Sequence, residues 1–227
     1  MIQFITLNSE SGLGRNVKLF KIQISFQGVL GMVIRDIQAG RISLPLRTPF
    51  KTALRTVDAV DDVVVRVVAD DGQVGYGEAP PTAVITGDTL GSIACAVKDF
   101  IRPALVGMDV EDLDAVMAKL QGCMVKNTSA KAAVDMAVLD LWGKRWGAPL
   151  YQLLGGARRC FQTDITISVN SIDQMVSDSL DAVRRGYRTL KIKVGKEGVQ
   201  DVARIAAIRK AVGPEVLLRV GANQGWD

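Results

Sequence analysis

Residues 190–195 read Leu-Lys-Ile-Lys-Val-Gly, and this stretch decides how the rest of the chain is interpreted. Lys191 and Lys193 are separated by one residue, so on a β-strand their side chains point to one face and the apolar residues of the stretch point to the other. On a strand with one wet face this alternation needs no further explanation. On a strand buried on both faces, two lysines are costly and indicate a chemical role.

The sequence around this stretch favours the buried strand. Three strands are predicted, at residues 163–169, 189–194 and 216–220. Helical patterns separate them, at residues 172–186 and 198–212. Alternation of strands and helices is typical of a parallel sheet covered by helices.

The chain before residue 160 predicts an α+β capping domain. Its predicted strands lie at residues 33–43, 60–69 and 73–77. Its predicted helices lie at residues 89–106, 109–124 and 130–146. Asp88 is the expected N-cap of the first helix, and Asn127-Thr128-Ser129 the expected cap of the third. Residues 44–57, which contain prolines and Arg55, are predicted to form a loop.

Residues 1–31 differ from this pattern. They contain a polar, glycine-bearing stretch, and Lys18 and Lys21 interrupt any apolar core of a signal peptide. The uncharged run at residues 22–34 is shorter than the roughly 20 apolar residues that span a bilayer. We therefore expect Met32 to be the native start, residues 1–31 to be an extension that is not native, and the domains to occupy residues 32–159 and 160–227.

The charge balance and the histidine and cysteine content exclude several classes of function. The 28 basic and 24 acidic residues give a net charge of only +4, and no basic run carries interleaved aromatics, so neither nucleic acid nor membrane is an expected partner. The chain has no histidine, which removes Ser-His and Cys-His nucleophiles and leaves acid–base chemistry to Lys, Asp, Glu, Tyr or Cys. Three cysteines without a C-x-x-C spacing predict free thiols in the cytoplasm: Cys95, Cys123 and Cys160.

Seven blocks of the sequence resemble the dipeptide epimerases of the enolase superfamily. Within that superfamily the resemblance is to the mandelate racemase/muconate lactonizing enzyme type. The blocks are residues 50–56 (FKTALRT), 74–81 (VGYGEAPP), 84–88 (VITGD), 129–137 (SAKAAVDMA), 153–156 (LLGG), 190–195 (LKIKVG) and 222–226 (ANQGW). The resemblance implies a capping domain followed by the start of a (β/α) TIM-like barrel, with the active site at the carboxyl ends of the strands. The first and third blocks point to the L-Ala-D/L-Glu type, which acts on cell-wall peptides.

The resemblance also implies residue roles. Members of the family remove the proton α to a carboxylate, and a bound Mg²⁺ stabilises the enediolate. Lys193 would be the acid/base on one face, and Lys191 would bind the carboxylate and lower the pKa of Lys193. Arg55 would contact the acidic side chain of the dipeptide, and Thr166 would hydrogen-bond to it. From the residues alone, Arg55 could equally be a solvated loop residue and Thr166 an ordinary strand residue.

Two features depart from the family pattern. Gly221 stands where the family has an Asp that binds Mg²⁺, so this ligand is lost and Mg²⁺ binding by this chain is in doubt. A (β/α)₈ barrel takes roughly 200 residues or more, so residues 160–227 can hold only about three strands of an incomplete barrel.

We therefore expect a fragment that is inactive by itself. The alternatives are a muconate cycloisomerase-like or o-succinylbenzoate synthase-like enzyme, and a non-catalytic truncated remnant. Whether a full-length form is a homo-oligomer is left open.

Overall fold

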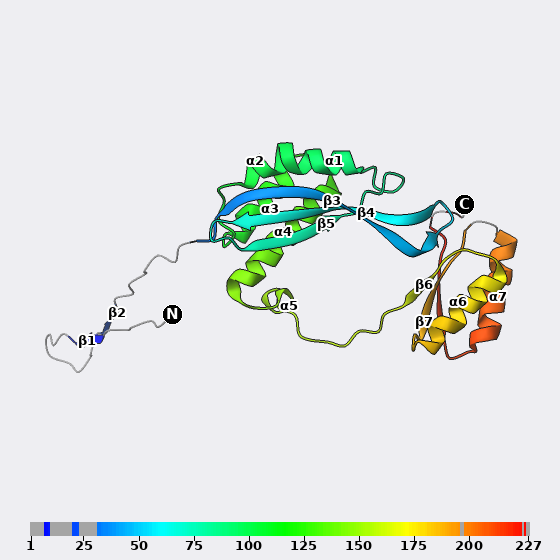
Figure 1. Cartoon of the computed structure of the whole chain (residues 1–227). Helices are drawn as coiled ribbons and strands as arrows, with labels where there is room; N and C mark the ends of the chain where they lie inside the picture. The colour runs from blue at the N-terminus through cyan, green and yellow to red at the C-terminus, as the bar shows by residue number, and fades with distance from the viewer. Residues whose placement is uncertain (1–6, 10–19, 23–30, 196–197, 224, 226–227) are drawn as a thin grey trace.

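The computed structural model describes residues 7–9, 20–22, 31–195, 198–223 and 225. Figure 1 shows two parts: an antiparallel sheet with helices, and a parallel sheet with helices, joined by a long segment that follows α5. The expected extension at residues 1–31 falls mostly outside the described residues. Within it, β1 (Leu7–Ser9) pairs in antiparallel fashion with β2 (Phe20–Ile22).

The first part is built on a three-stranded antiparallel sheet with the order β3-β4-β5. Its strands are β3 (Ile34–Lys51), β4 (Thr56–Ala69) and β5 (Val74–Ala79). Val63, Val65 and Val67 alternate along β4 and are almost fully buried in the first hydrophobic core, as expected for one face of a sheet covered by helices.

Helices cover this sheet. The elements α1 (Leu90–Cys95), η1 (Ala96–Ile101) and α2 (Arg102–Leu105) follow one another directly as one helical run that includes a π-helical segment. Pro103 lies inside this run, just after the π-helical segment. The run is followed by α3 (Leu113–Gly122), α4 (Thr128–Trp146) and α5 (Leu150–Leu153). Glycines on β5 let α4 approach the sheet closely: a Cβ on Gly75 or Gly77 would lie 1.9 Å from the carbonyl oxygen of Ala137 or Ala133, respectively.

The predicted loop at residues 44–57 is wrong except at residues 52–55, because residues 44–51 belong to β3 and residues 56–57 to β4. Strand β3 continues through both prolines to Lys51, with a bulge between Pro45 and Phe50, and only residues 52–55 form the turn. The prolines are tolerated because β3 is an edge strand, where a missing backbone N–H breaks no second ladder. Residues 42–62 thus form a two-stranded arm, called here the hairpin arm, which Figure 1 shows extending from the helices toward the second part.

The predicted helix caps also need correction. The Thr89 hydroxyl, not Asp88, accepts from the Ser92 N–H over 3.1 Å at the start of α1. The Asp88 carboxylate instead accepts from the Ser129 hydroxyl at the start of α4. Helix α4 begins after Asn127, which lies in the left-handed region at φ 52° and makes no side-chain cap bond.

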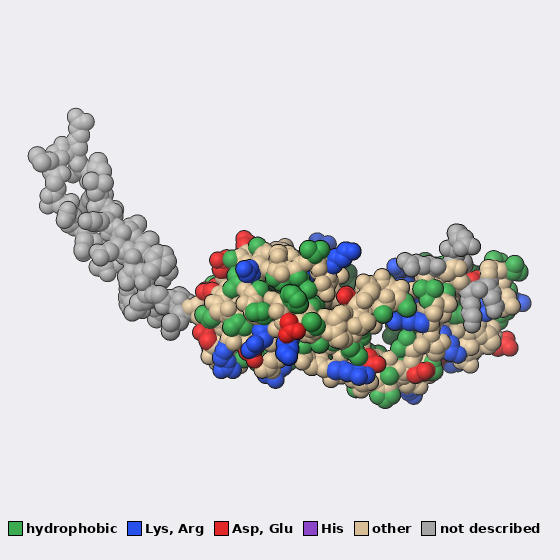
Figure 2. Space-filling model, turned by 90° about the horizontal axis from the view of Figure 1, so that it is seen from above, with side chains coloured by type: hydrophobic (Ala, Val, Ile, Leu, Met, Phe, Trp, Pro, Cys, Tyr) green, Lys and Arg blue, Asp and Glu red, His purple; other side chains and the backbone are tan. Residues whose placement is uncertain are grey.

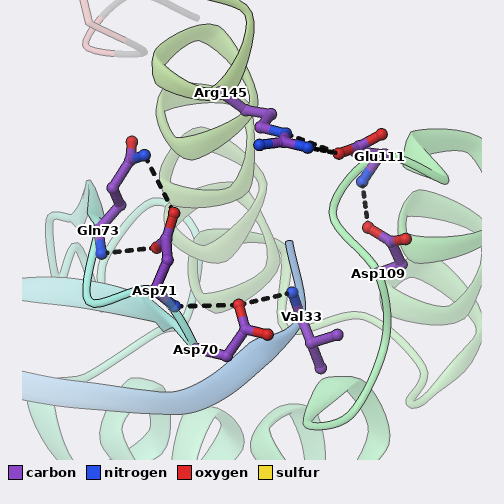
Figure 3. A network of polar contacts seen from close by, with 7 residues as sticks. All are labelled: Val33, Asp70, Asp71, Gln73, Asp109, Glu111 and Arg145. Carbon is purple, nitrogen blue, oxygen red and sulfur yellow. Dashed lines mark hydrogen bonds and ion pairs between the residues drawn. The ribbon is translucent and has the colours of Figure 1, made fainter. Parts of the chain in front are cut away.

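A group of polar contacts lies at the end of the antiparallel sheet that is opposite the hairpin arm (Figure 3). In the β4–β5 turn, the Asp70 carboxylate accepts from the backbone N–H of Val33 at 3.1 Å and of Asp71 at 3.0 Å. Nearby, Arg145 at the end of α4 pairs with Glu111 at 2.6 Å. The first contacts tie the β4–β5 turn to the start of β3, and the ion pair ties the end of α4 to the loop before α3.

The second part is a parallel sheet with the order β6-β7-β8. Its strands are β6 (Ile165–Ile167), β7 (Thr189–Lys193) and β8 (Leu217–Gly221). The connecting helices are α6 (Ile172–Arg184) and α7 (Gly198–Val212). Leu190, Ile192 and Val194 form a second hydrophobic core with residues of these helices. The predicted fold class, an α+β capping domain followed by three parallel strands of an incomplete barrel, is confirmed.

Surface charges of both signs are interspersed over the two parts on the face that Figure 2 shows. Within the described ranges, no helix is both long enough and apolar enough to cross a membrane. All three cysteines are free.

Candidate active site

The two lysines of β7 lie on the sheet face opposite the helices. Leu190 and Ile192 are fully buried toward the helices, so the alternation of the strand sends Lys191 and Lys193 to the other side, which would be the inside of a barrel. Lys193 is only 7% exposed, and Lys191 is half-buried. Lys193 is the last residue of β7, so its ammonium group lies at the carboxyl edge of the sheet.

The strand register places other polar residues beside the lysines. Thr166 on β6 and Arg219 on β8 both pair with Lys191, so these three residues form a row across the sheet. Gly221 pairs with Lys193 in the next row toward the carboxyl edge. The Nζ of Lys193 donates to the Asn223 side-chain oxygen over 2.6 Å.

Burial and a neighbouring charge both act on Lys193. Burial is the larger cause and lowers the pKa of Lys193 because it disfavours the ammonium form; the positive charge of Lys191 lowers it further. A lysine with a lowered pKa is present as the amine in a larger fraction at neutral pH. Lys193 can therefore accept a proton and return it, which is what general acid–base catalysis requires.

The tip of the hairpin arm is attached to the same edge of the sheet. The Val169 N–H, just after β6, donates to the Lys51 carbonyl oxygen over 3.2 Å, and the Lys51 N–H donates to the Ser168 hydroxyl over 3.3 Å. After β8, Gly225 lies so close to the tip that a Cβ there would be 2.8 Å from the Ala53 Cβ. Arg55 is in this tip and is exposed to solvent.

Thr166 also lines a groove of about 850 Å³ along the free edge of β6. The end of β3 contributes Arg47 and Lys51 to this groove, and the β6–α6 loop contributes Asn170. The groove brings Thr166 and the base of the arm tip to one surface, with hydrogen-bonding side chains on both sides.

The residues present do not fit a magnesium site. No group of three or more His, Cys, Asp or Glu side chains that could hold a metal occurs in the described part of the chain. Asp164 is engaged by Arg219 at 2.6 Å, and Asp140 is engaged by Lys144 at 2.7 Å. Gly221 offers no side chain, so these three strands provide no carboxylate cluster for a hard cation.

Sequence reasoning missed a buried ion pair beside the lysines. Asp201 is 1% exposed, and its carboxylate accepts from Arg204 at 2.9 Å and from the Gly195 N–H at 2.8 Å. Arg204 also donates to the Asn170 carbonyl oxygen over 3.1 Å. The pair thus ties the loops after β6 and β7 together; the only sequence signal was an Asp and an Arg three residues apart on one helix.

Asn223 was missed as a lysine partner for a different reason. It lies within the ANQGW block, but nothing in the sequence showed that its side chain reaches Lys193.

An antiparallel capping domain whose hairpin arm meets the carboxyl edge of a parallel sheet, with a desolvated lysine at that edge, defines the enolase-type (β/α)-barrel class of enzymes. The chain belongs to the mandelate racemase/muconate lactonizing enzyme family. The family's N-terminal domain matches residues 36–155, and the enolase C-terminal domain-like family matches residues 174–227.

Individual relatives agree with this membership. The L-Ala-D/L-Glu epimerase of Clostridium acetobutylicum is 56% identical over 196 residues, which are 86% of this chain and 55% of that protein. The solved substrate-liganded complex of the L-Ala-D/L-Glu epimerase from Bacillus subtilis matches with a TM-score of 0.83 at 50% identity, over 86% of this chain and 55% of that one.

A third match is the dipeptide epimerase from Cytophaga hutchinsonii, solved with Mg and the dipeptide D-Ala-L-Val. Its TM-score is 0.81 at 31% identity, over 86% of this chain and 53% of that one. The chain therefore spans about half the length of the relatives that it matches.

Proposed function

We propose that this chain is the capping domain and first barrel strands of a dipeptide epimerase that inverts the Cα of the C-terminal residue of L-Ala-D/L-Glu. The single observation that carries the proposal is the 7% exposure of Lys193 beside Lys191 at the carboxyl edge of the sheet. The identities of 56% and 50% to L-Ala-D/L-Glu epimerases support this substrate class over others in the family.

In this proposal Lys193 moves the proton at one face of the substrate carbon. Its amine form accepts the α-proton, and its ammonium form returns a proton to the same face. Lys191, one row away, provides a second positive charge that attracts the substrate carboxylate and keeps the pKa of Lys193 low. Asn223 holds the Lys193 Nζ at 2.6 Å and so orients it.

Arg55 and Thr166 are proposed to bind the dipeptide. The attachment of the arm tip at Lys51 and Ala53 supports a role for the tip in covering the site, and a guanidinium there is suited to a carboxylate side chain. Thr166 pairs with Lys191 and lines the groove along β6, which supports a hydrogen bond from its hydroxyl to the peptide.

Two alternatives have support of their own. Family membership also includes muconate lactonizing enzymes, which share the fold, so a cycloisomerase-like reaction is the runner-up. Gly221 and the lack of a carboxylate cluster in the described residues favour the second alternative, a chain that has lost catalysis. The cytoplasmic location, a homo-oligomeric full-length form and the domain limits 32–159 and 160–227 stay predictions.

The test is exchange of the α-proton. Residues 1–227 would be fused to the remaining part of the Bacillus subtilis L-Ala-D/L-Glu epimerase, with and without Gly221→Asp. Deuterium incorporation at the glutamate Cα of L-Ala-L-Glu in D₂O would then be followed by NMR with Mg²⁺ present. We expect exchange by the Gly221→Asp fusion and much slower exchange by the fusion that keeps Gly221.

The matched control is Lys193→Ala in the Gly221→Asp fusion. Loss of the general base should slow exchange by about 10²–10⁴-fold. Exchange at the parental rate in this variant would exclude Lys193 as the acid/base. Turnover of muconate, with no exchange into the dipeptide, would favour the cycloisomerase alternative.

A further inference from the structure

A pocket lies at the amino ends of β6 and β7, the end of these strands that is opposite Lys193. Its volume of about 390 Å³ is within the roughly 300–1,000 Å³ of small-molecule sites. Residues 185–189, which join α6 to β7, line it together with Gln162 and Thr163 of the segment before β6. The pocket is therefore built from two segments that meet where the parallel sheet begins.

The turn between α6 and β7 gives this pocket a positive charge. Arg185 and Arg188 both line it. Within the described part of the chain, Arg188 has no carboxylate partner. Arg185 has a distant one: its Nη1 lies 3.8 Å from the Asp181 carboxylate, which also pairs with Arg184 at 3.2 Å. One carboxylate is thus shared by two arginines, and the third arginine is left unneutralised.

Other carboxylates near the pocket in the sequence do not change this balance. Asp164 follows Thr163 directly, but it is engaged by Arg219 at 2.6 Å. Glu215 precedes β8 and does not line the pocket. The carboxyl end of a helix attracts cations, which accounts for arginines in the last turn of α6. It does not account for Arg188, which lies beyond the helix.

The turn also holds the arginines in a defined arrangement. Gly186 lies in the left-handed region at φ 95°, and its N–H donates to the Val183 carbonyl oxygen over 3.0 Å. The Tyr187 N–H donates to the Ala182 carbonyl oxygen over 3.1 Å, which completes a Schellman turn. The Arg185 guanidinium lies over the Tyr187 ring, 5.4 Å from its centroid. Stacking of this kind uses the flat face of a guanidinium and leaves the N–H groups at its edge available for an anion.

We propose that this pocket binds the phosphate group of a small molecule between the guanidinium groups of Arg185 and Arg188. A guanidinium donates two parallel hydrogen bonds to phosphate oxygens, and the Thr189 hydroxyl and the Gln162 amide are further donors in the lining. A phosphate monoester carries about −1.5 to −2 charges at pH 7, which two guanidinium groups balance. The site lies at the other end of the strands from Lys193 and does not rest on the proposed function.

The test measures how fast each arginine of the full chain reacts with phenylglyoxal, which modifies accessible guanidinium groups. Mass spectrometry of the proteolysed protein reports the extent of reaction at each residue. The rates would be compared in sodium chloride and in rising concentrations of inorganic phosphate, at an equal ionic strength of about 0.1 M. A second series would use ribose 5-phosphate in place of inorganic phosphate.

We expect phosphate to protect Arg188 and Arg185 in a saturable way. At a phosphate concentration ten times the Kd, their rates of modification should fall about tenfold. Arg184 is the internal control, because it belongs to the same run of arginines and its side chain is 73% exposed, but it does not line the pocket. Tighter protection by ribose 5-phosphate would identify the ligand as an ester, and protection by inorganic phosphate alone would identify free phosphate; either result supports the proposal.

Two variants complete the test. Arg188→Gln should abolish the protection of Arg185, whereas Arg184→Gln, which removes the same charge outside the pocket, should leave the protection of Arg185 and Arg188 in place. Urea unfolding without phosphate verifies that both variants are folded. The proposal is overturned if neither compound protects Arg188, if Arg184 is protected as strongly as Arg188, or if Arg188→Gln keeps full protection of Arg185. No dipeptide and no turnover enter the measurement, so its failure would leave the proposed function untouched.

Discussion

Gly77 on β5 lies directly under the backbone of α4, where a Cβ would come within 1.9 Å of the Ala133 carbonyl oxygen. Gly75 stands in the same relationship to Ala137 one helical turn further on. The capping domain therefore depends on two residues without side chains, since the longest helix could not otherwise reach the sheet.

Substitution of these glycines should destabilise the capping domain. Gly77→Ala forces the backbone of α4 away from β5, and we expect a loss of at least about 3 kcal/mol in the free energy of unfolding. Gly40→Ala is the matched control, because a Cβ on Gly40, also in a strand, meets nothing within 4 Å. Its effect should stay within about 1 kcal/mol. Urea unfolding followed by tryptophan fluorescence, to which Trp142 and Trp146 on α4 contribute, measures both variants.

The lowered pKa of Lys193 should make stability depend on pH. The unfolded chain holds the proton up to about the ordinary lysine pKa of 10.5, whereas the folded chain releases it earlier, so the unfolded state binds more protons between the two pKa values. Stability relative to Lys193→Met should therefore rise with pH across that window and stay flat below it. Urea midpoints across a pH series check the sign; a decrease with pH would contradict the burial argument.

Removal of Lys191 should partly restore the pKa of Lys193. In Lys191→Gln the second cause of the shift disappears while burial, the larger cause, stays. We expect the pKa of Lys193 to rise but to remain below 10.5, as measured by the pH dependence of Lys193 acylation. A pKa that does not move would mean that the two ammonium groups do not interact.

The buried ion pair beside β7 should be worth far more than a surface pair. Asp201→Ala removes the acceptor of both Arg204 and the Gly195 N–H, and we expect it to cost about 3 kcal/mol. Arg184→Ala breaks an exposed pair with Asp181 on α6 and should cost less than about 1 kcal/mol. Chemical denaturation of the two variants side by side gives the comparison, and equal costs would refute it.

Arg55 should set the preference for acidic dipeptides. In the Gly221→Asp fusion protein, Arg55→Met should raise the KM for L-Ala-L-Glu by roughly 10–100-fold, since a charge-assisted hydrogen bond is worth about 1.5–3 kcal/mol. The KM for L-Ala-L-Leu, which has no carboxylate side chain, should change little. Steady-state kinetics with both dipeptides measure the two KM values. An equal rise in KM for both dipeptides would mean that Arg55 supports the structure of the arm tip and does not recognise the acidic side chain.

The sequence predicted the parallel strands and the placement of the lysines well, because the alternation in β7 and the helices around it are local patterns. The predictions were wrong or incomplete where contacts between residues far apart in the sequence determine the local structure. Strand β3 passes through Pro45 and Pro49 only because it lies at a sheet edge, and the Asp88 carboxylate is drawn away from α1 by Ser129, 41 residues further on. The contact of Lys193 with Asn223 likewise joins residues 30 positions apart, which no periodicity reveals.

The length of the hairpin arm, which reaches from the antiparallel sheet to the parallel sheet, can change only by whole residues. Each residue advances a strand by about 3.3 Å and turns successive side chains to opposite faces. One added residue pair in the arm would therefore turn the tip over, whereas two added pairs would keep its facing and lengthen the reach by roughly 7 Å. Adaptation of this scaffold to longer peptides can thus proceed only by even steps, and an odd insertion would point Arg55 away from the chemistry it is proposed to serve.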